Sequence, residues 1–400
     1  MGNIDHDAVL RARVLLLGSG RLGPWEEIGA YRVLAEVSPR AYLPKLVDAL
    51  LAQAGHTRDP ERALALFEEA ADGARRLGAG LPDGNGPLLC ALDARRRALF
   101  AAGRRSEGRA VCEELAEAGS YVRLAVVLAE EGRHAEAAAL YGRHAEQAGK
   151  DGAEGTLVEW AAELDAAGRR EQALRVFGRL VDAERRRAAR DGDRPAALVG
   201  FLVHQAGMLR AAGARAAAAA AVQEALGVLG RLARDGEPAT WDGRWAHWIR
   251  LFPLSVRSDE PAATPEAPQP PFGSCPLLDW SPDTRGAWLA GAAALEERAA
   301  ALRASGELLE LLTVQRRLTA RRAVRRNSGD VESLLPEFDS GVALARRLPG
   351  APSAVARALT DRAMFLLAAR RYAQAHRDLA EAGALSDGPV YPISHPTSPE

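Results

Sequence analysis

One pattern occurs twice in close succession, in Leu124-AVVLAEEGRHAEAAALY-Gly142 and in Trp160-AAELDAAGRREQALRVF-Gly178. Each segment has a central glycine, with alanine seven residues before it, leucine four before it, alanine five after it and an aromatic residue nine after it. The central glycines are Gly132 and Gly168. Small and apolar residues recur at these offsets around Gly213 and, with arginine in place of glycine, around Arg370.

These offsets describe two helices joined by a short turn. Residues three or four apart share one face of a helix, so the positions on either side of the glycine form one face of each helix. A glycine between them suits the left-handed conformation that ends many helices. We expect four small residues to lie where the paired helices cross, namely Ala125, Ala137, Ala161 and Ala173. A single pair cannot bury its apolar face alone, so neighbouring pairs should stack.

The two segments resemble tetratricopeptide repeats (TPRs), in the degenerate, longer-repeat form of high-GC bacteria. The resemblance extends over roughly residues 40–235 and 285–385. It implies helix–turn–helix units that wind into a right-handed superhelix, whose concave groove serves protein–protein contact. The turn glycines Gly103, Gly132, Gly168 and Gly213 are spaced by 29, 36 and 45 residues, which departs from the regular family spacing of 34.

The composition agrees with a helical fold. The chain has 400 residues, of which 83 are alanine, and only 5% are aromatic. Alanine is the best helix former, whereas sheets are enriched in β-branched and aromatic residues. We therefore predict an all-α fold, an α-solenoid of stacked TPR-like helix–turn–helix repeats.

A change in composition suggests where the chain divides. The stretch Glu260-PAATPEAPQPPF-Gly273 is rich in proline and alanine and has no apolar periodicity, which is typical of a linker or a long surface loop. We expect an N-terminal helical array over residues 1–250, a proline-rich linker or long loop over 251–285, a C-terminal helical array over 286–387 and a disordered tail over 388–400. The two arrays form either one continuous superhelix or two bodies joined by the linker.

Charge and cysteine content favour a cytoplasmic protein that does not bind nucleic acid. The 52 basic and 53 acidic residues nearly cancel, so the chain lacks the basic surface of a nucleic-acid binder. The three cysteines, Cys90, Cys112 and Cys275, lack metal-ligand spacing, and so few suggest a reducing compartment. The N-terminus is acidic rather than basic, and we expect neither a signal peptide nor a membrane association.

No sequence motif indicates catalysis, a cofactor or a metal. Gly18, Gly20 and Gly23 match a dinucleotide-binding pattern, but the preceding residues read as a helix that ends at Gly18, with Pro24 starting the next. The histidines form no zinc-binding motif. Paired carboxylates such as Glu130-Glu131 are interpreted as solvated. We expect a non-catalytic protein, with an all-α enzyme built from distant residues as a third alternative.

A strongly basic segment stands apart. It contains Arg316, Arg317, Arg321, Arg322, Arg325 and Arg326. These arginines surround most of a helix rather than forming one stripe, so we interpret the segment as a solvated surface helix. A docking strip for an acidic partner, or a strip that contacts nucleic-acid phosphates, is the alternative.

The function that the resemblance implies is a scaffold that binds a protein or peptide in the concave groove. Ala129, Asp165 and Arg210 each precede a turn glycine by three residues and should project into that groove. A second candidate site consists of Trp241, Trp245 and Trp248, whose spacing puts them on one helix face, either as a cap of the first array or as an exposed anchor. The alternative function is a sensory or regulatory module that controls a separately encoded effector. The oligomeric state stays open.

Overall fold

A computed structural model describes residues 5–18, 22–77, 86–147, 149, 154–191, 195–236, 243–326 and 332–386. Within these ranges the chain consists of helices and contains no β-strand, which confirms the predicted all-α class. The expected tail over 388–400 lies outside the described residues, as does Trp241.

The first part of the chain is a row of helices in which each packs against the helix before it and the helix after it. These helices are α1 (His6–Leu17), α2 (Pro24–Val37), α3 (Pro39–His56), α4 (Pro60–Leu77), α5 (Gly86–Ala101), α6 (Arg105–Glu117), α7 (Val122–Glu130), α8 (His134–Gln147), α9 (Glu154–Ala166), α10 (Arg170–Asp191), α11 (Pro195–Ala211) and α12 (Arg215–Asp235). As expected, Gly18 is the C-cap of α1 and Pro24 begins α2.

The second part of the chain folds back along the first. It comprises α13 (Arg244–Val256), the short 3-10 helix η1 (Arg257–Asp259), α14 (Pro282–Ala290), α15 (Ala292–Ser305), α16 (Leu308–Arg325), α17 (Leu335–Arg346), α18 (Pro352–Ala368) and α19 (Tyr372–Ser386). The last helix, α19, packs against α12, and α13 lies against α11, α16 and α18. The returning helices thus enclose α13 between themselves and α11 rather than extending the row, and α14 reaches back to α5.

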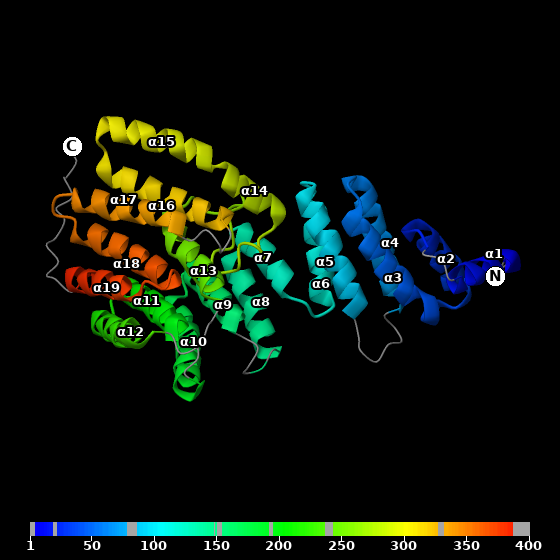
Figure 1. The fold of residues 1–400 in the computed structure, drawn as a ribbon, viewed down its shortest axis with the longest axis horizontal. Coiled ribbons are helices and arrows are strands. Elements are labelled where there is room, and N and C mark those ends of the chain that lie inside the picture. The colour runs from blue at the N-terminus through cyan, green and yellow to red at the C-terminus, as the bar shows by residue number, and fades with distance from the viewer. Residues whose placement is uncertain are drawn as a thin grey trace.

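The molecule has a narrow arm and a broad body (Figure 1). We call α1 to α6 the arm and α7 to α19 the body. The arm has its own apolar core, which includes Leu50, Ala70 and Leu92, whereas the main core of the body joins α9 to α13 with α16, α18 and α19. Contacts of α6 with α7 and of α5 with α14 connect the two parts.

The helix turns follow the predicted geometry. Gly132, Gly168 and Gly213 have φ of +77°, +76° and +78°, and the residue after each donates its amide to a carbonyl in the preceding helix. In the turn of Gly168, the amide of Arg169 bonds the carbonyl of Leu164 at 2.8 Å. Ala125, Ala137, Ala161 and Ala173 are all buried, which confirms their predicted place between paired helices. The glycine turns and the buried alanines at the helix crossings therefore define helix pairs that repeat along the chain.

The expected linker or surface loop over 251–285 needs correction. Residues 251–256 belong to α13, and α14 begins at Pro282. We call the intervening residues 260–281 the strap. Its residues 270–276 are buried, because Phe272 packs against Trp280 and Trp288 with ring centroids 5.9 and 6.3 Å away. Residues 261–267 are largely exposed, as expected of a surface loop, so the correction concerns residues 270–276, which lie in the core.

Helix α12 is also notable for its composition. By length and hydropathy alone, it is the one helix among the described residues that could cross a membrane. Its apolar side, which includes Val222, Ala225 and Leu229, is buried, and the helix packs between α11 and α19. Helix α12 is therefore an amphipathic helix that packs one face into the body.

Candidate functional site

The strap covers one side of helices α7 and α9, where the sequence predicts a partner-binding groove. It leaves η1, crosses α9 and α7, and ends at α14 (Figure 1). The strap and the residues that flank it are attached to the helices at three places, and these determine which part of the helical row stays open.

The first attachment is the carboxylate of Glu260. Its side chain is only 1% exposed and accepts hydrogen bonds from Arg317, at 2.9 Å from Nη2, and from Arg321. Burial alone would raise the pKa of Glu260, but the hydrogen bonds and positive charges of Arg321 and Arg317 lower it overall. Arg321 also lies 4.3 Å from the ring centroid of Trp288 and donates to its carbonyl. This carboxylate therefore fixes the start of the strap to α16.

The second attachment lies over α9 and α7. Arg257 of η1, just before the strap, donates to the carbonyl of Ala162 at 2.6 Å and to the carboxylate of Asp165 at 2.8 Å. Gly273 of the strap lies against the same helix, since a Cβ on it would be 3.0 Å from the Cβ of Ala162. Further along, the amide of Gln269 donates to the carbonyl of Glu130 at 3.0 Å. The strap passes so close to the α7 turn that a Cβ on Gly132 would lie 2.2 Å from the carbonyl oxygen of Ala263. Position 132 therefore requires glycine for two reasons. Its φ is left-handed, and the strap leaves no room for a Cβ.

The third attachment is the carboxylate of Glu130 at the end of α7. It has no exposed surface, accepts from the amide of Ser281 at 2.8 Å and pairs with Arg105 at 2.8 Å. Burial raises the pKa of Glu130, although Arg105 opposes the shift. Arg105 also donates to Asp283 and Thr284 at 3.0 Å, so the end of the strap is bonded to both α6 and α7. The interpretation of Glu130-Glu131 as solvated carboxylates is wrong.

The basic segment is likewise internal to the fold. Arg316 pairs with Asp361 at 2.6 Å and with Asp259 at 2.7 Å, and its side chain is only 10% exposed. Arg322 pairs with Glu296 at 3.0 Å, and Arg325 donates to the carbonyl of Leu289 at 3.1 Å. The predicted solvated helix therefore needs correction, because carboxylates from elsewhere in the chain neutralise much of its charge.

The three predicted groove residues do not come together as one open surface. Ala129 is buried in the apolar cluster between α7 and α8. Asp165 already pairs with Arg257, and Arg210 is half-buried on α11. The strap thus takes the place at α7 and α9 that a partner would need.

Trp245 and Trp248 lie in the core on α13. Both are buried, and Trp248 stacks on Phe252 with ring centroids 5.2 Å apart and meets Phe365 edge-on at 5.6 Å. These contacts agree with the interpretation of the tryptophans as packing residues and leave neither as an exposed anchor. The third predicted member, Trp241, lies outside the described residues.

The open part of the row lies in the arm. Asp93 on α5 pairs with Arg123 at 2.9 Å, and Arg123 pairs with Asp279 of the strap at 3.2 Å, so this face of α5 is turned toward the strap. Cys90 and Arg97 lie on the same helix face as Asp93 and are exposed. Helix α3 contacts α5 directly, and its exposed stripe includes Lys45 and Asp48.

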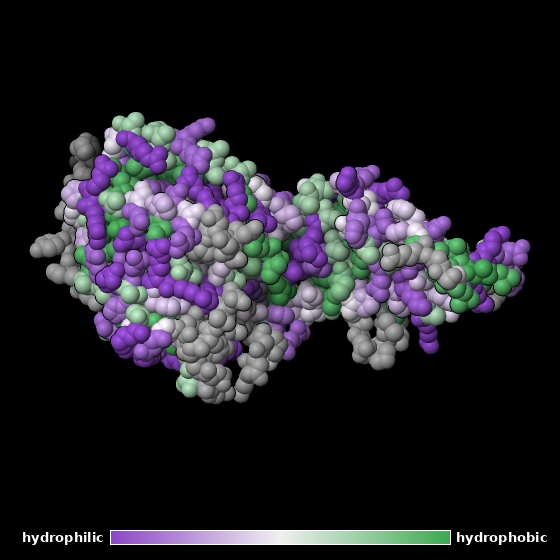
Figure 2. Space-filling view, viewed as in Figure 1, coloured by the Kyte–Doolittle hydropathy of each residue, from purple (hydrophilic) through white to green (hydrophobic). Residues whose placement is uncertain are grey.

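The free end of the arm carries a second accessible surface. Figure 2 shows apolar atoms gathered there, and Leu10, Val14 and Leu17 on α1 are exposed. Their spacing places them on the face opposite buried Val9 and Ala12. Apolar patches of this kind are typical of contact surfaces.

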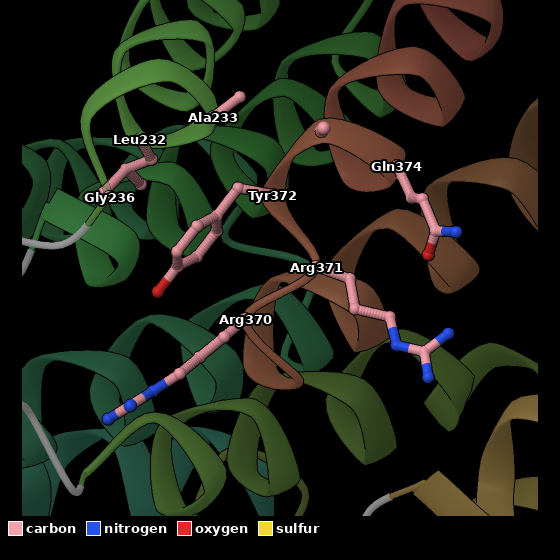
Figure 3. A pocket seen from close by; sticks show the side chains of 8 residues that line it. Leu232, Ala233, Gly236, Arg370, Arg371, Tyr372 and Gln374 are labelled. Carbon is pink, nitrogen blue, oxygen red and sulfur yellow. The ribbon is translucent and has the colours of Figure 1, made fainter.

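The surface of the described part of the chain is hollowed at two places that bear on ligand binding. A narrow apolar notch of about 40 Å³ lies beside Phe252, Phe338 and Ala358. A larger hollow of about 590 Å³ lies where the α18–α19 turn meets the end of α12 (Figure 3). The larger one falls within the volume range of small-molecule sites, which is roughly 300–1,000 Å³.

The residues that attach the strap were not identified from the sequence. Glu130, Glu260 and Arg257 form the strap attachments, and each bonds a group far away in the chain. The available sequence signal was the aromatic residues Phe272 and Trp280 in and beside an otherwise proline-rich segment. The chain matches no known protein-family profile and no curated protein.

Proposed function

We propose that this chain is a non-catalytic protein–protein interaction scaffold built from TPR-like repeats. The observation that carries the proposal is the strap, an extended polypeptide segment that one side of the helical row already binds. The amide of Gln269 donates to the carbonyl of Glu130, and the amide of Ser281 donates to the carboxylate of Glu130. A helical row that binds one extended segment can bind an extended segment of a partner protein where the strap does not cover the row.

The repeat geometry supports the TPR assignment. Left-handed glycines end the first helix of successive pairs, and buried alanines lie at the crossings. In such an array the first helix of each pair lines the concave wall, and the strap lies on two of these helices, α7 and α9. The open wall for a partner is then formed by α3 and α5.

The character of this open wall favours a polar, extended partner. Lys45 and Asp48 on α3 and Arg97 on α5 present charges of both signs beside the small residues Ala52 and Ala94. A mixed polar surface of this kind suits an extended peptide with spaced charges better than an apolar helix. We further propose a cytoplasmic location and no nucleic-acid ligand, since the basic helix α16 is neutralised internally.

Site-specific photo-crosslinking in cells that naturally produce the chain tests this proposal. A photoreactive amino acid at position 97 of α5 or 45 of α3 should give a defined crosslinked protein. The matched control is Ala110, which is exposed on the neighbouring helix α6.

The partner identified in this way is then measured against charge-reversed variants. Arg97→Glu together with Lys45→Glu should weaken its binding at least tenfold without lowering the melting temperature. Equal crosslinking at Ala110, or no defined product at positions 45 and 97, would argue against a partner on the open wall.

A further inference from the structure

The hollow of about 590 Å³ lies on the opposite end of the molecule from the arm. The α12 side contributes Leu232, Ala233 and Gly236, and the α18–α19 turn contributes residues from Arg370 to Gln374. Figure 3 shows Arg370 and Tyr372 extending to the side of this turn on which Leu232 and Gly236 lie, whereas Arg371 and Gln374 extend to the other. One side of the hollow therefore combines a cation with an apolar wall.

The backbone of Arg370 is unusual for the residue that occupies it. Arg370 has a φ of +61° and is the only residue other than glycine with a positive φ in the described part of the chain. The equivalent turns have Gly103, Gly132, Gly168 and Gly213, and their φ values lie between +71° and +78°. Glycine adopts this conformation without strain, whereas a residue with a Cβ does not. The arginine side chain is thus present although the turn itself favours glycine.

The charge of Arg370 is also not paired within the described part of the chain. Its neighbour Arg371 donates to Glu332 at 2.8 Å. Arg370 is exposed, and among the described residues no carboxylate lies within ion-pair distance of it. This contrasts with Arg316, Arg317 and Arg321, which all pair with carboxylates inside the molecule.

We infer that this hollow binds a small organic oxyanion, whose charged group meets the guanidinium of Arg370 and whose apolar part rests on the exposed wall at Ala233 and Gly236. A guanidinium presents a planar pair of N–H donors that matches either a carboxylate or a phosphate group. The apolar share of the lining favours an anion that carries an organic body over a bare inorganic ion. This site is separate from the open wall of α3 and α5.

Calorimetric titration with three probes tests the inference on the full chain. The probes are phenyl phosphate, benzoate and inorganic phosphate, so that the two oxyanion types and the contribution of the apolar body are measured separately. We expect one of the two aromatic anions to bind more tightly than inorganic phosphate.

Arg370→Gly is the decisive variant, because glycine suits the turn and the fold is retained. It should melt at a higher temperature than the wild type and bind the preferred aromatic anion at least tenfold more weakly. Arg370→Lys should bind with intermediate affinity. The control is Arg303→Gln on α15, which removes an exposed arginine elsewhere and should leave binding unchanged.

Three results would overturn the inference. The first is undetectable binding of all three probes to the wild type. The second is equal affinity in the wild type and in Arg370→Gly. The third is binding of inorganic phosphate as tight as that of both aromatic anions, which would remove the role of the apolar wall.

Discussion

The amide of Ser281 donates a 2.8 Å hydrogen bond to Oε1 of Glu130, a carboxylate with no exposed surface. This bond connects residues 151 positions apart in the chain and fastens the end of the strap to the end of α7. Because Arg105 pairs with the other oxygen of the same carboxylate, one side chain joins α6, α7 and the strap.

Glu130→Ala should therefore be strongly destabilising. Removing one partner of a buried ion pair leaves the other charge uncompensated, and such changes cost about 3–5 kcal/mol. We expect a loss of about 3 kcal/mol, the lower end of that range, because Asp283 still accepts from Arg105. Chemical denaturation measures the change. Glu113→Gln removes a carboxylate of an exposed pair on α6 and should cost less than about 1 kcal/mol, so similar losses in both variants would contradict the assigned role.

Contacts such as these, between residues far apart in the chain, limit how much of the structure could be predicted from the sequence. The helix pairs were predictable because their signals are local, with Ala161 and Ala173 lying seven residues before and five after Gly168. Arg370 was predictable as a turn residue for the same reason. Such patterns depend only on helical periodicity and turn conformation.

The strap was not predictable, because its partners are distant in the chain. Nothing near Arg321 in the sequence indicates that Glu260 will neutralise it, 61 residues away. Likewise, Glu130 stands next to another glutamate and gives no local sign that Ser281 and Arg105 will bury its charge. Proline content suggested solvent exposure, which holds for residues 261–267, whereas residues 270–276 and Trp280 lie in the core.

A second prediction compares two glycines that share the same backbone conformation. Alanine at Gly132 or Gly168 must adopt a left-handed φ, which costs about 1–2 kcal/mol at either position. Only Gly132 faces the strap, where the added Cβ would lie 2.2 Å from the carbonyl oxygen of Ala263, whereas nothing lies within 4 Å at Gly168. Gly132→Ala should lose clearly more stability, and hydrogen exchange at the Gln269 amide should accelerate. Equal losses would show that the strap does not press on this turn.

A third prediction concerns helix crossings and uses two alanines on α8. Ala137 is buried against α7, and Ala139, two residues later, is exposed. Leucine at position 137 should overpack the crossing and cost roughly 1–3 kcal/mol. Leucine at position 139 should change stability by less than about 0.5 kcal/mol, as surface substitutions usually do. Thermal melting of the two variants compares them directly, and comparable effects would contradict the crossing at Ala137.

A fourth prediction follows from a buried carboxyl group on α9. Burial raises the pKa of Glu159 to about 8, and the positive charge of Arg250 only partly opposes this shift. In the folded protein the group stays protonated up to that pH, whereas in the unfolded chain it ionises near its ordinary pKa of 4.5. Its effect on stability is therefore favourable below about pH 4.5 and is lost as the pH rises toward 8.

Glu159→Gln should remove this pH dependence. The variant should match the wild type near pH 5 and become relatively more stable toward pH 8, by up to about 1.4 kcal/mol per pH unit. Denaturant titrations of both proteins across this range give the difference, in which the other titrating groups cancel. A difference that stays constant with pH would contradict a protonated Glu159 in the folded protein.

The last prediction separates a protein scaffold from a nucleic-acid binder. Phosphate contacts require arginines that are free to leave their partners, and here Arg316, Arg317 and Arg321 are held by carboxylates of the same chain. Non-specific binding at physiological salt has a Kd of roughly 10⁻⁴ to 10⁻⁶ M, and we expect no tighter affinity for single- or double-stranded probes. Fluorescence anisotropy over a range of salt concentrations measures it. The control is Arg322→Gln with Arg325→Gln, which removes the two more exposed charges of α16 without touching the buried pairs. Submicromolar binding that falls steeply with salt and weakens in this variant would contradict the scaffold proposal, because steep salt dependence reflects counterion release from contacted phosphates.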